Sequence, residues 1–183
     1  MPSRRVTARE FWQALCSELQ RVQPRGYGTA WTTGMYEVLH GVQRRFRLWC
    51  QCGAHASAAD GQNREMLEID FTWFAGENDW DAPVVAIEHE NSHVRAERAK
   101  DHWRVNQVAA PLRVFIGYVG ARRSLDAAAA ELREREARCN QVVGGEALLL
   151  MGYANMDVTD FRAWSCLQGE PSTWRELPFA TTS

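Results

Sequence analysis

The stretch PVVAIEHE, residues 83–90, is an apolar run that ends in two glutamates separated by a histidine. The unbroken apolar residues from Val84 to Ile87 are typical of a central strand that is covered on both faces. Side chains alternate between the two faces of a strand, so Glu88 and Glu90 share the face opposite His89. The stretch therefore predicts a buried strand that brings two carboxylates to the margin of the core.

The sequence on either side of this stretch predicts the rest of an α/β fold. Apolar residues at helical spacing predict helices at 7–22 and 32–43. Two further helices are expected, one that follows the caps at 91–92 and runs to about 108, and one at 125–138 after Ser124. Strand-like runs occur at 46–52, 66–74, 112–119 and 147–151. The expected order is α-α-β-β-β-α-β-α-β, in which the first three strands form a meander. A crossover helix then makes the fourth strand parallel to the third.

Length and composition are those of one globular domain spanning residues 1–183. The chain has 183 residues, of which 45% are hydrophobic and 24% charged. Because no apolar stretch reaches the length of a membrane span and residues 1–10 lack an export signal, we expect a cytoplasmic protein without a membrane partner. The formal net charge of −2 gives no support to nucleic-acid binding, although it allows a local basic face.

A third carboxylate belongs with the pair at the end of residues 83–90. In the strand-like run 66–74, Asp70 shares a face with Glu68 and Thr72. If this strand is an antiparallel neighbour of 83–90, Asp70 approaches Glu88 and Glu90. Buried carboxylates repel one another unless a positive group lies among them. That group is either a hard divalent cation such as Mg²⁺, for which Mn²⁺ can substitute, or an arginine of the next helix. The available arginines are Arg95, Arg98 and Arg104. The remaining alternative is that Glu88 and Glu90 lie in solvent at the end of the strand.

A metal at this position predicts hydrolytic chemistry. Asp70 and Glu88 would ligate the ion together with a backbone carbonyl near His89. The ion would polarise a phosphoryl oxygen and lower the pKa of a bound water near neutral pH. Glu90 could accept the proton of that water or hold a second ion.

Asp70, followed by Glu88-x-Glu90 at the end of an apolar strand within an α-β-β-β-α-β order, resembles the PD-(D/E)XK nuclease superfamily. It is most similar to the restriction-endonuclease variants with E-x-E in place of E-x-K. The resemblance covers about residues 31–119 and implies a restriction-endonuclease-like mixed sheet. It also implies that Asp70 and Glu88 are metal ligands and that Glu90 replaces the lysine that positions the attacking water. The chain departs from the usual motif at Ile69, which stands in place of proline, and at position 90, which is not lysine.

The resemblance implies two further site residues on helices. The superfamily often has an acidic residue on the helix before the sheet, which here is Glu37. In some members a basic residue from the helix after the motif takes the role of the lysine, and Lys100 or Arg104 is placed to do so. Periodicity alone leaves the alternative that Glu37 and Lys100 are solvated helix residues.

The densest basic and aromatic group is a candidate nucleic-acid contact. Arg44, Arg45 and Arg47 alternate with Phe46 and approach Trp49. Guanidinium groups bind phosphates, and aromatic rings stack on unpaired bases. Arg45 and Arg47 share a face if the segment is a strand. The alternative is a solvated helix end, where arginines lie near the negative end of the helix dipole.

The sequence thus predicts a Mg²⁺-dependent nuclease that hydrolyses phosphodiester bonds, with DNA as the expected partner. Cleavage of both strands of a duplex would in addition suggest a homodimer. One alternative is a catalytically inactive protein of the same fold that binds nucleic acid or another protein. Another alternative is a hydrolase of some other phosphate ester.

Overall fold

The computed structural model describes residues 5–26, 28–52, 69–77, 82–138, 144–153, 156–167 and 173–180, with the backbone alone at residues 51 and 52. Within these ranges the helices are α1 (Ala8–Val22), α2 (Thr29–Phe46), α3 (Arg95–Asn106) and α4 (Leu125–Arg138), with short 3₁₀ helices η1 (Arg122–Ser124) and η2 (Val158–Asp160). The strands are β1 (Trp49–Cys52), β2 (Phe71–Phe74), β3 (Val85–Glu90), β4 (Leu112–Val119), β5 (Glu146–Tyr153), β6 (Arg162–Leu167) and β7 (Arg175–Leu177).

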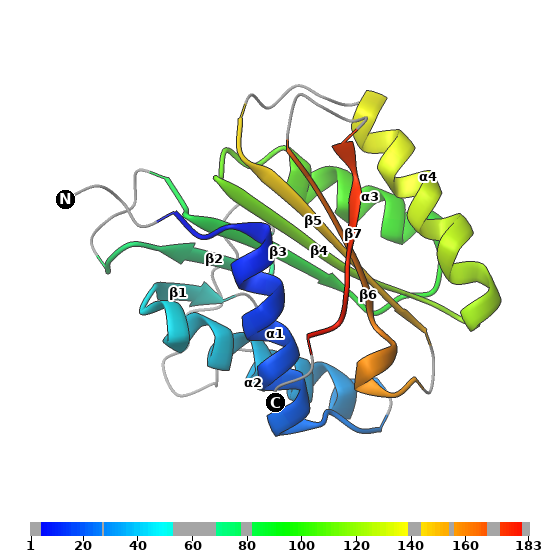
Figure 1. The fold of residues 1–183 in the computed structure, drawn as a ribbon, viewed down its shortest axis with the longest axis horizontal. Helices are drawn as coiled ribbons and strands as arrows, with labels where there is room; N and C mark the ends of the chain where they lie inside the picture. The colour runs from blue at the N-terminus through cyan, green and yellow to red at the C-terminus, as the bar shows by residue number, and fades with distance from the viewer. Residues whose placement is uncertain are drawn as a thin grey trace.

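The described strands form one seven-stranded sheet in chain order (Figure 1). The pairs β1–β2 and β2–β3 are antiparallel, as are β5–β6 and β6–β7. The central pairs β3–β4 and β4–β5 are parallel, and α3 and α4 provide the two crossover connections. This topology confirms the predicted mixed α/β sheet and the parallel fourth strand. It adds β6 and β7, which the sequence pattern did not predict.

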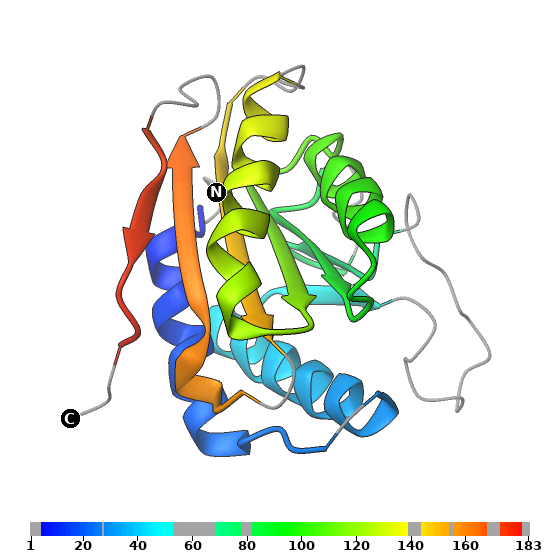
Figure 2. The same ribbon diagram turned by 90° about the vertical axis from the view of Figure 1, so that its right-hand side faces the viewer.

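Helices cover both faces of the sheet, α1 and α2 on one side and α3 and α4 on the other (Figure 2). Along β3, Ile87 packs into the core under α1 and α2 together with Leu15, whereas Ala86 packs under α3 with Val105. The strand is therefore buried on both faces, as its unbroken apolar run predicts. Among the described helices, none combines the length and the apolar character needed to span a membrane.

The helix α2 is longer than predicted at both ends, beginning at Thr29 and ending at Phe46. Phe46 is buried and follows Val42 by four residues, so it extends the apolar face of the helix for one more turn. Arg47 then adopts a left-handed backbone with φ of 55°. The prediction that residues 46–52 form a strand is therefore wrong for its first residues, and β1 begins at Trp49.

The strand β2 begins at Phe71, later than the predicted 66–74, and Asp70 lies in a bend just before it. The backbone N–H and the side chain of Asp70 both bond to the end of β3. These contacts replace the regular ladder that a longer strand would make. The predicted strand residues 66–68, among them Glu68, lie outside the described residues.

The helix α3 begins at Arg95, with Val94 at the N-cap and no side-chain cap, so the predicted caps at Asn91 and Ser92 are wrong. Both residues bond elsewhere. The Asn91 amide donates to Oγ1 of Thr32 at 2.7 Å, and the hydroxyl oxygen of Ser92 accepts from the N–H of Val94 at 3.1 Å. The segment between β3 and α3 is consequently a loop that joins the end of the strand to the first turn of α2.

Candidate functional site

Asp70 and Glu88 meet where β2 begins and β3 ends. The register pairs Phe71 with Ile87, which places the residues just beyond them side by side. The N–H of Asp70 donates to Oε2 of Glu88 at 3.1 Å. In return, Oδ2 of Asp70 accepts from the N–H of His89 at 2.8 Å. The sequence prediction that these two carboxylates lie together is thus confirmed as a matter of position.

The helix α3 adds a third carboxylate and a positive charge to this pair. Nη1 of Arg104 lies 3.1 Å from Oε1 of Glu88 and 3.3 Å from Oδ1 of Asp101. Asp101 also shares a hydrogen bond with Glu90, whose Oε1 accepts from the N–H of Ser92 at 2.5 Å. We refer to Asp70, Glu88, Glu90 and Asp101 as the acidic cluster.

Burial and mutual repulsion make the carboxylates of the acidic cluster hard to ionise. Glu88 is only 5% exposed. Its burial, and after that the charge of Asp70, raise its pKa to about 8. Burial and the hydrogen bond with Asp101 raise the pKa of Glu90, which is half-buried, to about 7. Both glutamates therefore hold protons to a higher pH than ordinary glutamates, although the charge of Arg104 lowers the pKa of Glu88, and a bound cation would displace these protons.

His89 points to the other face of the sheet, as strand alternation predicts. It is buried, with Nε2 2.9 Å from the hydroxyl of Tyr118, and its ring meets that of Tyr36 at 6.0 Å. Burial lowers the pKa of His89 to about 3, so its imidazole is neutral. The residue supports the aromatic core under α2 and takes no part in the acidic cluster.

The predicted helix residues occupy different places. Arg104 contacts Glu88 directly, whereas Lys100 is exposed on α3. Glu37 lies on α2, which covers the opposite face of the sheet from Arg104 (Figure 2). Its side chain is 60% exposed, and Oε1 lies 3.7 Å from Nη2 of Arg21. The structure therefore does not bring Glu37 to the acidic cluster, because the helix turns this side chain toward α1 and solvent.

The predicted nucleic-acid contacts lie at the far end of α2. Arg44 and Arg45 are exposed in its last turn, and Arg47 is exposed at its C-cap. The prediction that Arg45 and Arg47 share a strand face is wrong, because Arg45 is helical. Thr32, which bonds to the loop after β3, precedes Arg44 by twelve residues, or about 18 Å of helix. The arginines thus have the placement of a solvated helix end, and their binding of nucleic acid stays a prediction.

Sequence reasoning missed Asp101 as a member of the cluster. Glu97, Asp101 and Arg104 follow one another at helical spacing, which places them on one side of α3. Combined with the crossover from β3 to β4, that spacing signals a helix face turned toward the end of β3. The signal was present in the sequence but is shared by many solvated helices.

The donor chemistry of the acidic cluster fits Mg²⁺, which prefers carboxylate oxygens. The buried charges of Asp70, Glu88 and Glu90 are of the sign that such an ion would neutralise. In the structure, Arg104 supplies the positive charge next to Glu88. Within the described ranges, no group of three or more His, Cys, Asp or Glu side chains lies close enough together to hold a metal. Metal binding would therefore require these side chains to change rotamer and exchange Arg104 for the ion.

Comparisons of the chain with protein-family models, with curated proteins and with solved structures found no match. The prediction of a PD-(D/E)XK nuclease consequently depends on Asp70, on Glu88-x-Glu90 and on the order of the strands in this chain alone.

Proposed function

We propose that this chain is a metal-dependent nuclease that hydrolyses phosphodiester bonds, with DNA as its substrate, at the acidic cluster. The observation that carries the proposal is the contact of Asp70 with Glu88 where β2 begins and β3 ends, with Glu90 two residues further along β3. Burial raises the pKa of both glutamates, so the cluster holds protons that a divalent cation would replace. Perturbed carboxylates gathered at one point are typical of catalytic sites.

The topology supports the same proposal. A helix, a three-stranded antiparallel meander, a crossover helix and a parallel fourth strand occur in the order α2-β1-β2-β3-α3-β4. This is the order on which the similarity to the PD-(D/E)XK nucleases rests. The strand that carries Glu88 and Glu90 occupies the third position in that order.

In this proposal Asp70 and Glu88 hold the ion, which would polarise a phosphoryl oxygen and acidify a bound water. Glu90, with a pKa of about 7, is suited to accept a proton from the attacking water near neutral pH. Arg104 is placed to balance the negative charge that develops on the phosphoryl group, the role that the motif lysine would otherwise share. Lys100 is the alternative for that role, although its exposed position requires it to turn inward.

A specific observation favours a second function, that of a catalytically inactive binding module. The contact of 3.1 Å between Arg104 and Glu88 neutralises the carboxylate without a metal, and position 90 lacks the lysine of the motif. A protein that had lost hydrolysis could retain this ion pair as a structural link between α3 and β3. It would then bind nucleic acid or a protein without any requirement for metal.

The experiment that tests the first function is a calorimetric titration with Mn²⁺ of the wild type and of Glu88→Gln. Glu134→Gln, which changes an exposed carboxylate on α4, is the matched control. We expect saturable binding in the wild type and the control and its loss in Glu88→Gln, together with loss of Mn²⁺-dependent cleavage of labelled DNA. Equal Mn²⁺ binding in all three proteins, with no cleavage, would reject the nuclease proposal. Metal-independent DNA binding that survives Glu88→Gln would support the binding module.

A further inference from the structure

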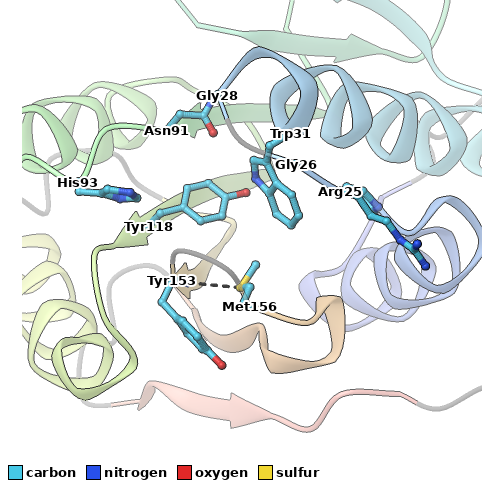
Figure 3. A pocket seen from close by; sticks show the side chains of 10 residues that line it. Arg25, Gly26, Gly28, Trp31, Asn91, His93, Tyr118, Tyr153 and Met156 are labelled. Carbon is cyan, nitrogen blue, oxygen red and sulfur yellow. Dashed lines mark hydrogen bonds between the residues drawn. The ribbon is translucent and has the colours of Figure 1, made fainter.

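A cavity of about 360 Å³ lies where the parallel strands β3, β4 and β5 end (Figure 3). This volume is within the range of small-ligand sites. Its walls come from the segment before α2, the first turn of α2, the loop after β3, the end of β4 and the end of β5. We call it the aromatic pocket; it is lined by Pro24, Arg25, Gly26, Gly28, Trp31, Asn91, His93, Tyr118, Tyr153 and Met156.

Fixed aromatic rings form the inner wall of the aromatic pocket. Trp31 meets Tyr118 edge to face at 5.9 Å and stacks with Phe161 at 6.4 Å. Tyr118 is only 4% exposed, and its hydroxyl is held 2.9 Å from Nε2 of His89. The backbone N–H of Tyr153 donates to the sulfur of Met156 at 3.3 Å, which fixes the opposite wall. The pocket thus has flat apolar surfaces that contacts within the protein hold in place.

The polar groups of the pocket lie around these rings and are neutral or basic. Asn91 supplies a carboxamide, His93 an imidazole and Arg25 an exposed guanidinium. Among the described residues that line the pocket, none is acidic. A flat ligand with hydrogen-bonding edges and an attached negative charge matches this set. A nucleobase on its phosphate backbone has each of these properties.

The loop after β3 connects the aromatic pocket to the acidic cluster. Glu90 belongs to the cluster, and the next residue, Asn91, lines the pocket. Adjacent Cα atoms are about 3.8 Å apart, so the two sites are joined at this loop, with the pocket on the α1 and α2 side of the sheet and the acidic cluster on the α3 side. Asn91 is fixed there by its bond to Thr32, and Arg98 holds the same loop through the carbonyl oxygens of His93 and Tyr118, each at 3.1 Å.

We propose that the aromatic pocket binds one unpaired nucleobase of the strand whose phosphodiester lies at the acidic cluster. The inference rests on the proposed nuclease function and specifies its substrate as single-stranded or locally unpaired nucleic acid. A base in a duplex is stacked and paired, so it cannot enter the pocket without being extruded. The ring of Trp31 provides the surface on which the base stacks, and Arg25 at the rim of the pocket meets the backbone.

Photocrosslinking locates the base directly and requires no variant. A short single-stranded oligonucleotide of 4-thiothymidine is irradiated with the wild-type protein in EDTA, and the crosslinked peptides are identified by mass spectrometry. We expect crosslinks at Trp31, Tyr153 or Met156. Crosslinks confined to other surfaces, such as the end of α2 at Arg44 and Arg45, or their complete absence, would overturn the inference.

Two substitutions measure the contribution of the pocket to affinity, by fluorescence anisotropy of the labelled oligonucleotide. Trp31→Leu should weaken binding by roughly 5- to 150-fold, the effect of losing one aromatic stacking platform. Arg25→Glu alters only the exposed rim and preserves the test if Trp31→Leu does not fold. Its charge-matched control is Arg9→Glu. Arg9 is exposed at the start of α1, whereas Arg25 follows the end of that helix. Equal affinity of Arg25→Glu and Arg9→Glu, or tighter binding of a duplex than of the single strand, would contradict the proposal.

The same proteins separate failure of the pocket from failure of the nuclease. Mn²⁺ binding and Mn²⁺-dependent cleavage report on the acidic cluster, whereas the crosslinks report on the pocket. Cleavage without crosslinks at the pocket residues would leave the nuclease and reject the base site. Crosslinks at the pocket without Mn²⁺ binding would leave the base site and reject hydrolysis.

Discussion

Arg104 and Glu88 form an ion pair across the junction of α3 and β3, with Nη1 and Oε1 3.1 Å apart. The side chain of Glu88 is 6% exposed and that of Arg104 is 21% exposed, so water screens their attraction only in part. The pair is the alternative that the sequence left open, in which an arginine of the following helix neutralises the glutamate. It also places Arg104 in direct competition with any cation that binds Glu88.

We therefore expect Arg104→Met to tighten the binding of Mn²⁺. A single charge within about 4–6 Å shifts an ionisation equilibrium by one unit or more, so the affinity should rise by about tenfold. Calorimetric titration measures the change. Arg95→Met is the control, because Arg95 is exposed on α3 and pairs with Glu131 of α4. If Arg104 also stabilises the reacting phosphoryl group, cleavage falls while metal affinity rises. Weaker Mn²⁺ binding in Arg104→Met would instead show that the arginine organises the ligands.

The metal-free protein should lose stability as the pH rises, because of Glu88 and Glu90. Their pKa values of about 8 and about 7 in the folded protein exceed the ordinary value of 4.5. The folded state thus binds protons more tightly than the unfolded state. The stabilisation from these protons is fully present below about pH 4.5. It declines as the pH rises and is lost once the pH has passed about 7 for Glu90 and about 8 for Glu88.

Glu88→Gln should remove the part of this decline that Glu88 causes. At pH 8.5 or so, the metal-free variant should exceed the wild type in free energy of unfolding by up to about 5 kcal/mol, and the two should converge near pH 4.5. Urea unfolding at a series of pH values measures both curves, with Glu134→Gln as the control. Parallel curves for the wild type and Glu88→Gln would refute the assignment of the raised pKa to Glu88.

The part of the site that the sequence predicted depends on local periodicity. The apolar run before Glu88 identified a central strand, and alternation along it separated His89 from the two glutamates. If the preceding strand pairs antiparallel with it, Asp70 comes beside Glu88, and the structure contains that pairing. Each step uses a rule of strand geometry, so the position of these carboxylates could be predicted from the sequence.

The rest depends on packing between distant segments. The end of α2 at Phe46 was missed because an aromatic residue among arginines fits a strand as well as a helix, and only burial against the core decides. Asp101 belongs to a charged helix in which solvated and buried positions look alike. The aromatic pocket unites Trp31, Tyr118 and Tyr153, which come from three elements that no local pattern connects.

The arginines at the end of α2 can be tested without reference to the acidic cluster. Replacing Arg44 and Arg45 together by alanine should reduce the slope of log affinity against log salt concentration by about 1.4 for a single strand if both contact phosphates. Affinities at several salt concentrations give the slope. Mn²⁺ binding should be unchanged, because α2 covers the face of the sheet opposite the acidic cluster. An unaltered slope would show that these arginines are a solvated helix end.

A second group of buried charges lies on the α3 and α4 side of the sheet. Arg113 of β4 is 1% exposed and Glu136 of α4 is 8% exposed. Oε2 of Glu136 lies 3.6 Å from Nε2 of His102. Burial lowers the pKa of Arg113 to about 10, and the charge of Glu136 opposes that shift. Glu136 therefore supplies a nearby negative charge to the guanidinium without a direct hydrogen bond to it.

Glu136→Gln should accordingly lower the free energy of unfolding by about 3 kcal/mol, because it leaves the buried guanidinium of Arg113 without a neighbouring anion. The double variant Arg113→Met, Glu136→Leu removes both charges and should recover most of that loss, since apolar side chains of similar size fill the same space. Urea unfolding with an unchanged m-value measures both effects, and Glu134→Gln on the exposed side of α4 should change stability by less than about 0.5 kcal/mol. If the double variant were less stable than Glu136→Gln, Arg113 would contribute through packing and hydrogen bonding, including its contact with the carbonyl oxygen of Gly144, and not through charge.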